Sequence, residues 1–103
     1  MIEIKDNDIS FIKKKECYLF FYFTAKWCGP CQRIKPLIQK LDEGLDDKKI
    51  EFYMIDIDNN DELSEEYDIK SVPTFILIHK EEIKGQCSGS DITKVHKLLK
   101  ENI

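Results

Sequence analysis

Two cysteines three positions apart, Cys28 and Cys31, are the residues of this chain whose types and spacing could do chemistry. They stand in the stretch TAKWCGPCQRIKP, directly after a run of apolar and aromatic residues. Thiols at this spacing can bind a metal, cross-link a loop through a structural disulfide, or exchange electrons with the disulfide of another protein. In such an exchange one thiolate attacks the substrate disulfide, and the second thiol displaces the product and leaves the pair oxidised. The rest of the sequence has to distinguish these three kinds of chemistry.

The composition is that of a folded protein and argues against several classes of function. The chain has 103 residues, 42% hydrophobic and 35% charged, so we expect a single domain spanning residues 1–103. Acids and lysines are interspersed and the net charge is −4, which disfavours a nucleic-acid partner. The first ten residues do not resemble a secretory signal, and the longest apolar run, residues 17–23, is too short to cross a bilayer. We therefore expect a cytoplasmic monomer with no membrane partner.

The spacing of apolar residues predicts alternating strands and helices around the cysteines. Strands are expected at residues 2–4, 17–23, 51–57, 74–79 and 82–88. Helices are expected at residues 8–15 and from the cysteines to residue 45. Two further helices are expected, one beginning after residues 59–61 and one after Ser90 or Asp91. The order β-α-β-α-β-α-β-β-α is typical of an α/β fold, with a central sheet and helices on both of its faces. The last two strands should form an antiparallel hairpin. This frame places Cys28 just after a buried strand and at the start of a long helix.

The start of a helix favours redox chemistry at the cysteine pair. Unpaired N–H groups and a partial positive charge at that position stabilise a thiolate at Cys28, and Cys31 lies one turn further into the helix. A zinc site would need about four ligands, and His79, Cys87 and His96 lack paired ligand spacing, so we expect no metal. A persistent structural disulfide is disfavoured in a reducing compartment. We interpret the pair as redox-active.

The two remaining cysteines have simpler interpretations. Cys17 opens the predicted buried strand, and we expect it to be a small core residue. Cys87 falls in the last predicted strand, at the edge of the sheet, where a redox-sensing or modified thiol remains an alternative.

The motif WCGPC at residues 27–31, the strand before it, VPT at 72–74 and Gly89 together resemble the thioredoxin family. The resemblance covers essentially the whole chain. It implies the thioredoxin fold, a central mixed sheet of up to five strands flanked by four helices. It also implies reduction of disulfide-bearing proteins without a bound cofactor, and regeneration by an NADPH-dependent thioredoxin reductase. Cys28 would be the nucleophile and Cys31 the resolving thiol, with Gly29 and Pro30 setting the reduction potential.

The same resemblance implies a substrate-binding groove beside the cysteines. Trp27 is similar to the family's surface indole, and Pro73 to its cis-proline facing the cysteines. The backbone of Val72 would pair with an extended substrate segment, and Gly89 would line the groove, where a side chain blocks close approach of a backbone. Thr74 is adjacent to this groove, although we interpret it more simply as a strand residue.

Two positions depart from the family pattern. Thioredoxins carry a buried aspartate six residues before the first cysteine, and a charged residue often accompanies it from the next strand. Here these positions are Tyr22 and Met54. Because a phenol has an unperturbed pKa of about 10, Tyr22 does not replace a carboxylate as a base. We therefore expect an altered environment for proton transfer at Cys31, partly supplied by a water or by the Tyr22 hydroxyl.

Two alternative functions stay open at this point. The protein could oxidise or isomerise protein disulfides, although the Gly-Pro dipeptide and the missing export signal argue against it. It could also be a thioredoxin-like binding module that uses the groove and not the thiols.

Overall fold

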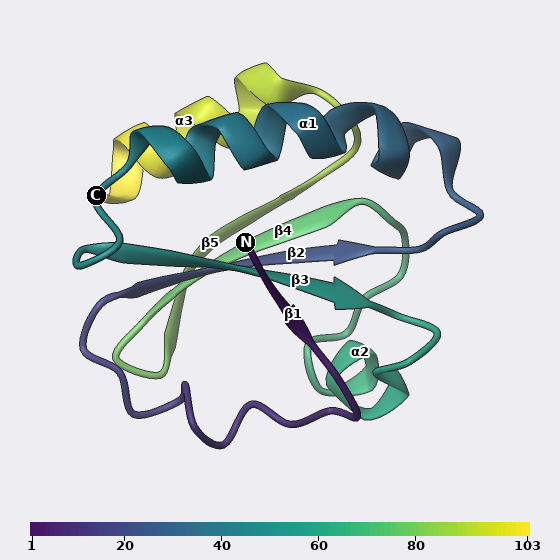
Figure 1. Cartoon of the computed structure of the whole chain (residues 1–103), viewed down its shortest axis with the longest axis horizontal. Coiled ribbons are helices and arrows are strands. Elements are labelled where there is room, and N and C mark those ends of the chain that lie inside the picture. The colour runs from purple at the N-terminus through teal and green to yellow at the C-terminus, as the bar shows by residue number, and fades with distance from the viewer.

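A five-stranded mixed sheet forms the centre of the molecule (Figure 1), a computed structural model that describes residues 1–103. The strands are β1 (Ile2–Ile4), β2 (Tyr18–Thr24), β3 (Ile50–Asp56), β4 (Thr74–His79) and β5 (Glu82–Ser88), and the helices are α1 (Gly29–Gly44), α2 (Asp61–Glu66) and α3 (Ile92–Asn102). The strand order is β1-β3-β2-β4-β5. β1, β3 and β2 are parallel, whereas β4 and β5 are antiparallel to their neighbours. The predicted order of elements is confirmed with one exception.

The exception is the helix predicted at residues 8–15, which is wrong. This segment forms a series of turns, in which the Ile9 carbonyl accepts hydrogen bonds from the N–H groups of Ile12 (3.0 Å) and Lys13 (3.1 Å). The Asp8 carboxylate accepts a hydrogen bond from the Ser10 hydroxyl at 2.8 Å, and such local bonds compete with helix formation. Ile9 and Ile12 are held by burial against the sheet and not by a helix. The molecule therefore has three helices rather than four.

Both faces of the sheet are covered, which explains the continuous apolar run of β2. Phe20 and Tyr22 face α1 and α3, and Phe21 and Phe23 face α2 and the turns of residues 8–15. Alternate residues of a strand point to opposite faces, so a strand buried on both sides reads as an unbroken hydrophobic run. The result is two separate apolar cores, and the cysteine pair forms a small third cluster with Ala25.

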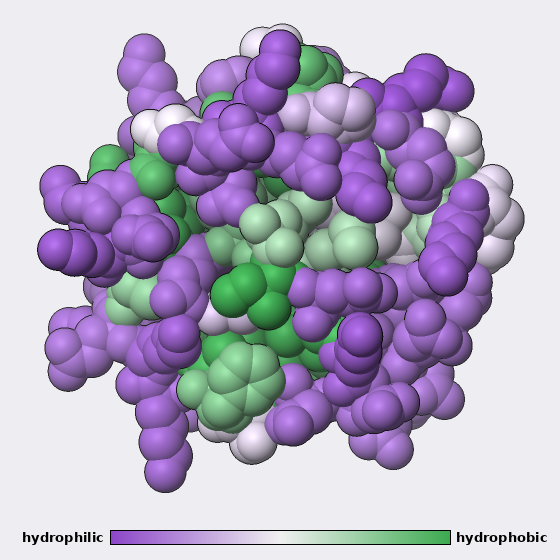
Figure 2. All heavy atoms as spheres, viewed as in Figure 1, coloured by the Kyte–Doolittle hydropathy of each residue, from purple (hydrophilic) through white to green (hydrophobic).

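The outer surface is mostly hydrophilic. On the face drawn in Figure 2, polar and charged side chains surround a smaller group of apolar side chains around β1, where Ile2 is half-exposed. None of the three helices combines the length and the apolar character that a membrane span requires.

Helix α2 is not capped by the side chain of its own N-cap residue. Asn60 occupies the N-cap position, but its side chain makes no capping bond. The side chain is fully buried, and its amide donates to the carbonyl oxygens of Ile4 at 3.1 Å and Asp56 at 2.9 Å. Asn7 supplies the missing cap, because its Oδ1 accepts a hydrogen bond from the Leu63 N–H at 3.1 Å. Asn60 Oδ1 in turn accepts from the Asn7 N–H at 2.8 Å.

An ion pair ties the segment before β2 to β3. Lys15 Nζ donates to both carboxylate oxygens of Glu51, at 2.9 and 2.8 Å, and the hydroxyl of Tyr53 donates to the same carboxylate. Partial burial would raise the pKa of Glu51, but the bonds from Lys15 and Tyr53 outweigh it and hold that pKa below its usual range. The charged form of Glu51 is therefore the one that stabilises the fold.

Replacing the Glu51 carboxylate tests the ion pair with Lys15. We expect Glu51→Gln to lower the free energy of unfolding by about 1 kcal/mol at neutral pH, a value reduced by the solvent exposure of Lys15. A carboxylate with a lowered folded pKa stabilises above its unfolded pKa of about 4.5 and less as pH falls below that value. Urea denaturation at neutral and acidic pH measures this, and the two proteins should converge in acid. An equal difference at both pH values would contradict the assignment.

Candidate active site

Cys28 and Cys31 are joined as a disulfide at the N-terminus of α1. Cys28 is the N-cap residue of the helix, and its Sγ accepts a hydrogen bond from the Cys31 N–H at 3.2 Å. Gly29 and Pro30 form the first turn, a position where proline is tolerated because that N–H has no partner within the helix. Cys31 is completely buried, while Cys28 keeps a small exposed area. Cys28 is therefore the sulfur that an incoming disulfide can reach.

The peptide bond between Val72 and Pro73 is cis and lies against the cysteine pair. The Val72 carbonyl oxygen is 3.7 Å from Cys28 Sγ. Ala25, Ile57 and Val72 pack around the two sulfurs. The structure thus brings together the two sequence motifs that lie some forty residues apart.

Trp27 lies on the surface beside the pair. Its side chain is 68% exposed, and its Nε1 donates to Asp58 Oδ2 at 3.0 Å. Asp58 follows the end of β3, and its role has no sequence signal, since nothing in a local pattern connects an aspartate to an indole 31 positions away. The bond holds the indole in a defined orientation at the rim of the site.

Thr74 and Gly89 meet below the cis peptide bond, at the start of β4 and the end of β5. The Thr74 hydroxyl donates to the Ser71 carbonyl at 2.7 Å and lies 3.1 Å from Ser88 Oγ, so it is satisfied within the protein. The Gly89 N–H donates to the Pro73 carbonyl at 2.9 Å. Gly89 has φ of +96°, and a Cβ there would meet no atom within 4 Å. Within this chain glycine is required by its backbone conformation rather than by a lack of space.

Tyr22 lies directly behind the cysteine pair. It is fully buried, its hydroxyl donates to the Cys31 carbonyl at 2.6 Å, and its ring stacks on Phe75 at 5.4 Å. Burial raises the pKa of the Tyr22 phenol, so the hydroxyl keeps its proton and acts as a donor. Met54 is the neighbour of Tyr22 across the β2–β3 pair and is half-buried. Neither side chain offers a base to Cys31.

Cys17 and Cys87 are free thiols, both half-buried. Cys17 packs against the core on the α2 face but is not enclosed by it, so the prediction of a core residue holds only in part. Cys87 lies on the edge strand β5, as predicted. Burial raises the pKa of each thiol, which keeps both unreactive at neutral pH. No three histidine, cysteine or acidic side chains gather where they could hold a metal ion.

Comparison with known proteins gives one consistent result. The model of the family described as Thioredoxin matches residues 3–101. The thioredoxin of Bacillus subtilis is 34% identical over 84 residues, covering 81% of this chain and 80% of that one, and the thioredoxin of Sus scrofa is 33% identical over 81 residues, covering 79% and 75%. The crystal structure of reduced Schistosoma mansoni thioredoxin pre-protein is 37% identical, with a TM-score of 0.89, and covers 99% of this chain and 97% of that one. The chain has the thioredoxin fold, here with three helices, and it belongs to the thioredoxin family as a thiol–disulfide oxidoreductase whose redox pair is Cys28 and Cys31.

Proposed function

We propose that Cys28 is the nucleophile and Cys31 the resolving thiol in the reduction of disulfides in other proteins. The observation that carries this assignment is the position of Cys28 at the N-cap of α1, with the Cys31 N–H on its sulfur and an opening to solvent. A thiolate formed there is stabilised by that N–H and by the helix dipole. Cys31 is enclosed, so it attacks only the sulfur next to it.

The substrate segment binds in the groove between Trp27 and the cis peptide bond. The backbone of Val72 pairs with an extended stretch of the substrate, with Pro73 and Gly89 shaping the adjoining surface. The support is the 3.7 Å approach of the Val72 carbonyl to Cys28 and the exposure of Trp27. Thr74 acts indirectly, since its hydroxyl is already used between β4 and β5. Gly29 and Pro30 tune the reduction potential by fixing the turn between the two sulfurs.

The oxidised protein is regenerated by a separate NADPH-dependent thioredoxin reductase, and the domain of residues 1–103 itself needs no cofactor because electrons pass between sulfurs. We propose that it acts as a monomer in the cytoplasm. Its relatives also include "Thioredoxin O, mitochondrial" of Oryza sativa, 38% identical over 81 residues, so the compartment has to be tested by localisation of the native protein.

The reduction potential of the pair tests the direction of the reaction. In a Cys17→Ser, Cys87→Ser background, Trp27 fluorescence across a dithiothreitol redox series should report one two-electron transition, because the indole adjoins the pair. We expect a value near about −270 mV, which thioredoxins show. A value near about −180 mV or above would indicate a disulfide oxidase or isomerase instead. The absence of any transition would leave only the binding module.

A further inference from the structure

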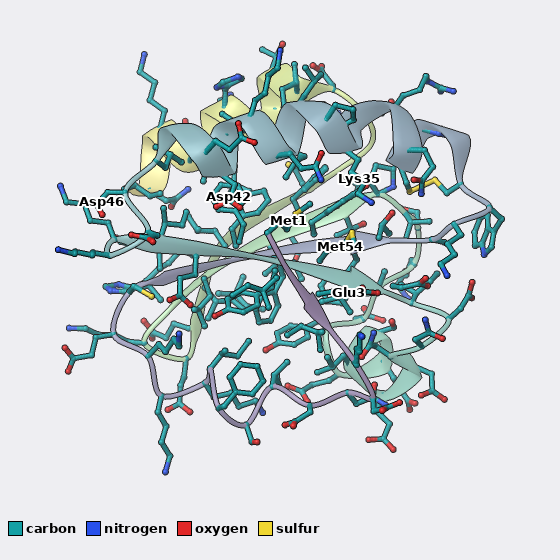
Figure 3. The ribbon with its side chains drawn as sticks, viewed as in Figure 1. Met1, Glu3, Lys35, Asp42, Asp46 and Met54 are labelled. Carbon is teal, nitrogen blue, oxygen red and sulfur yellow. A yellow bond between two sulfur atoms is a disulfide. The ribbon has the colours of Figure 1, made fainter.

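A small polar cavity lies beside the first turns of α1. Its volume is about 60 Å³, and its walls come from β1, β2, β3 and α1. Six of the eight residues that line the cavity are Glu3, Thr24, Gln32, Lys35, Met54 and Asp56. Figure 3 shows Met54 between Glu3 on β1 and Lys35 on α1, three of the residues that line the cavity, and Glu3 is exposed to solvent. A space of this size holds at least one water molecule.

The inner end of the cavity carries two buried polar side chains. Thr24 is 5% exposed, and its Oγ1 has no hydrogen-bond partner in the protein. Asp56 is 4% exposed, forms no ion pair, and accepts through Oδ1 only from the Asp58 N–H at 2.9 Å. The two residues are direct neighbours across the β2–β3 pair, so their side chains project from the same face of the sheet. A buried hydroxyl without a partner costs about 1–3 kcal/mol, which a bound water removes.

One wall residue of the cavity, Ala25, also packs against the cysteine pair. Ala25, the residue after Thr24, packs directly against the two sulfurs. Gln32, the residue after Cys31, lines the cavity and donates from Nε2 to the Ala25 carbonyl at 2.9 Å. Ala25 therefore lines the cavity on one side and contacts the cysteine pair on the other.

We propose that a water held between the Thr24 hydroxyl and the Asp56 carboxylate takes the proton of Cys31 when that thiol resolves the mixed disulfide. This step rests on the function proposed above. The Cys31 S–H proton passes through the water to Asp56, and the thiolate attacks Cys28 Sγ. The Cys28–Cys31 bond forms as the bond to the substrate sulfur breaks, and the two electrons leave on the substrate thiolate. Asp56 then releases its proton to solvent.

No other titratable group around the cavity fits this role as well. Tyr22 keeps its proton, because burial raises its pKa and its hydroxyl already donates to Cys31. Lys26 and Lys35 line the cavity but carry no carboxylate. Asp58 is engaged by Trp27, and Glu3 is exposed to solvent. Among these groups, only Asp56 is a buried carboxylate that lines the cavity next to Thr24.

The experiment separates the two chemical steps with dithiobis-nitrobenzoate in the Cys17→Ser, Cys87→Ser background. Attack by Cys28 releases one coloured thiolate, and resolution by Cys31 releases the second, so stopped-flow absorbance follows each step across a pH series. We expect Asp56→Asn to slow the second phase at least about tenfold at neutral pH and to move its pH profile to higher pH. The first phase should stay within about twofold. Asparagine keeps the acceptor for the Asp58 N–H, so the turn after β3 is preserved.

Matched variants exclude a merely structural effect. Thr24→Val should also slow the second phase, whereas Thr24→Ser should restore it because the hydroxyl returns. Glu3→Gln removes the other carboxylate of the cavity and should change neither phase. A second phase with unaltered rate and pH profile in both Asp56→Asn and Thr24→Val overturns the proposal. A wild-type protein with no second phase overturns the dithiol mechanism itself, which is a different outcome.

Discussion

Replacing Cys31 with serine is expected to lower the steady-state rate of disulfide reduction by at least about 10³-fold, a loss typical of removing an essential reacting group. Cys28 remains at the N-cap of α1 with the residue-31 N–H on its sulfur, so its attack on the substrate continues. The mixed disulfide then has no adjacent thiol to resolve it. The protein should therefore accumulate as a covalent adduct with its substrate, which mass spectrometry of the intact complex measures beside turnover.

Two control variants separate the role of Cys31 from those of the attacking thiol and of an uninvolved thiol. Cys28→Ser should abolish turnover without trapping an adduct, because the attacking sulfur is gone. Cys17→Ser should retain the wild-type rate, since that thiol precedes β2 whereas the redox pair follows the opposite end of this strand. Turnover of Cys31→Ser within about tenfold of wild type would show that another thiol resolves the intermediate, and the role given to Cys31 would be wrong.

Replacing Tyr22 with aspartate, the residue that the family usually has, is expected to destabilise this protein by at least about 5 kcal/mol. Tyr22 is fully buried and stacked on Phe75, so the change removes a large aromatic ring from a packed core. It also places a carboxylate beside Met54, which offers no charge to pair with it. This cost is comparable to the whole stability of a small domain. Urea denaturation of the oxidised protein measures it.

Variants at the same two positions separate the ring from the charge. Tyr22→Phe keeps the ring and loses only the bond to the Cys31 carbonyl, which should cost about 1–2 kcal/mol. Adding Met54→Lys to Tyr22→Asp should recover about 1–3 kcal/mol, because the cation faces the new carboxylate across the strand pair. If Tyr22→Asp alone stayed within about 2 kcal/mol of wild type, the core behind Cys31 would be wetter and looser than its packing indicates.

The parts of the molecule that could be predicted from sequence are those with a local signal. The unbroken apolar run predicts β2, two short runs joined by a few residues predict the hairpin of β4 and β5, and the cysteine pair marks the start of α1. The helix predicted at residues 8–15 failed because its apolar spacing reflects anchoring of turns on the sheet rather than helical packing. Leu37 is adjacent in sequence to the buried Ile38 on α1, yet it is exposed.

The site residues missed from sequence all depend on contacts between distant segments. Asp58 is 31 positions from Trp27, and no local pattern joins them. Thr24 reads as the last residue of a strand, and Asp56 as the end of another. They become a pair only through the register of β2 on β3, which sequence spacing does not specify.

The exchange of hydrogen bonds between Asn7 and Asn60 also bears on what stabilises helix α2. Helix α2 spans six residues, too few to persist on its own, and its cap comes from a residue more than fifty positions earlier. The amide of Asn60 also needs the carbonyl of Ile4, at the end of β1. Two of the hydrogen bonds at the start of helix α2 therefore depend on the segment of β1 and the turn that follows it. The stability of helix α2 therefore comes from long-range contacts and not from its own sequence.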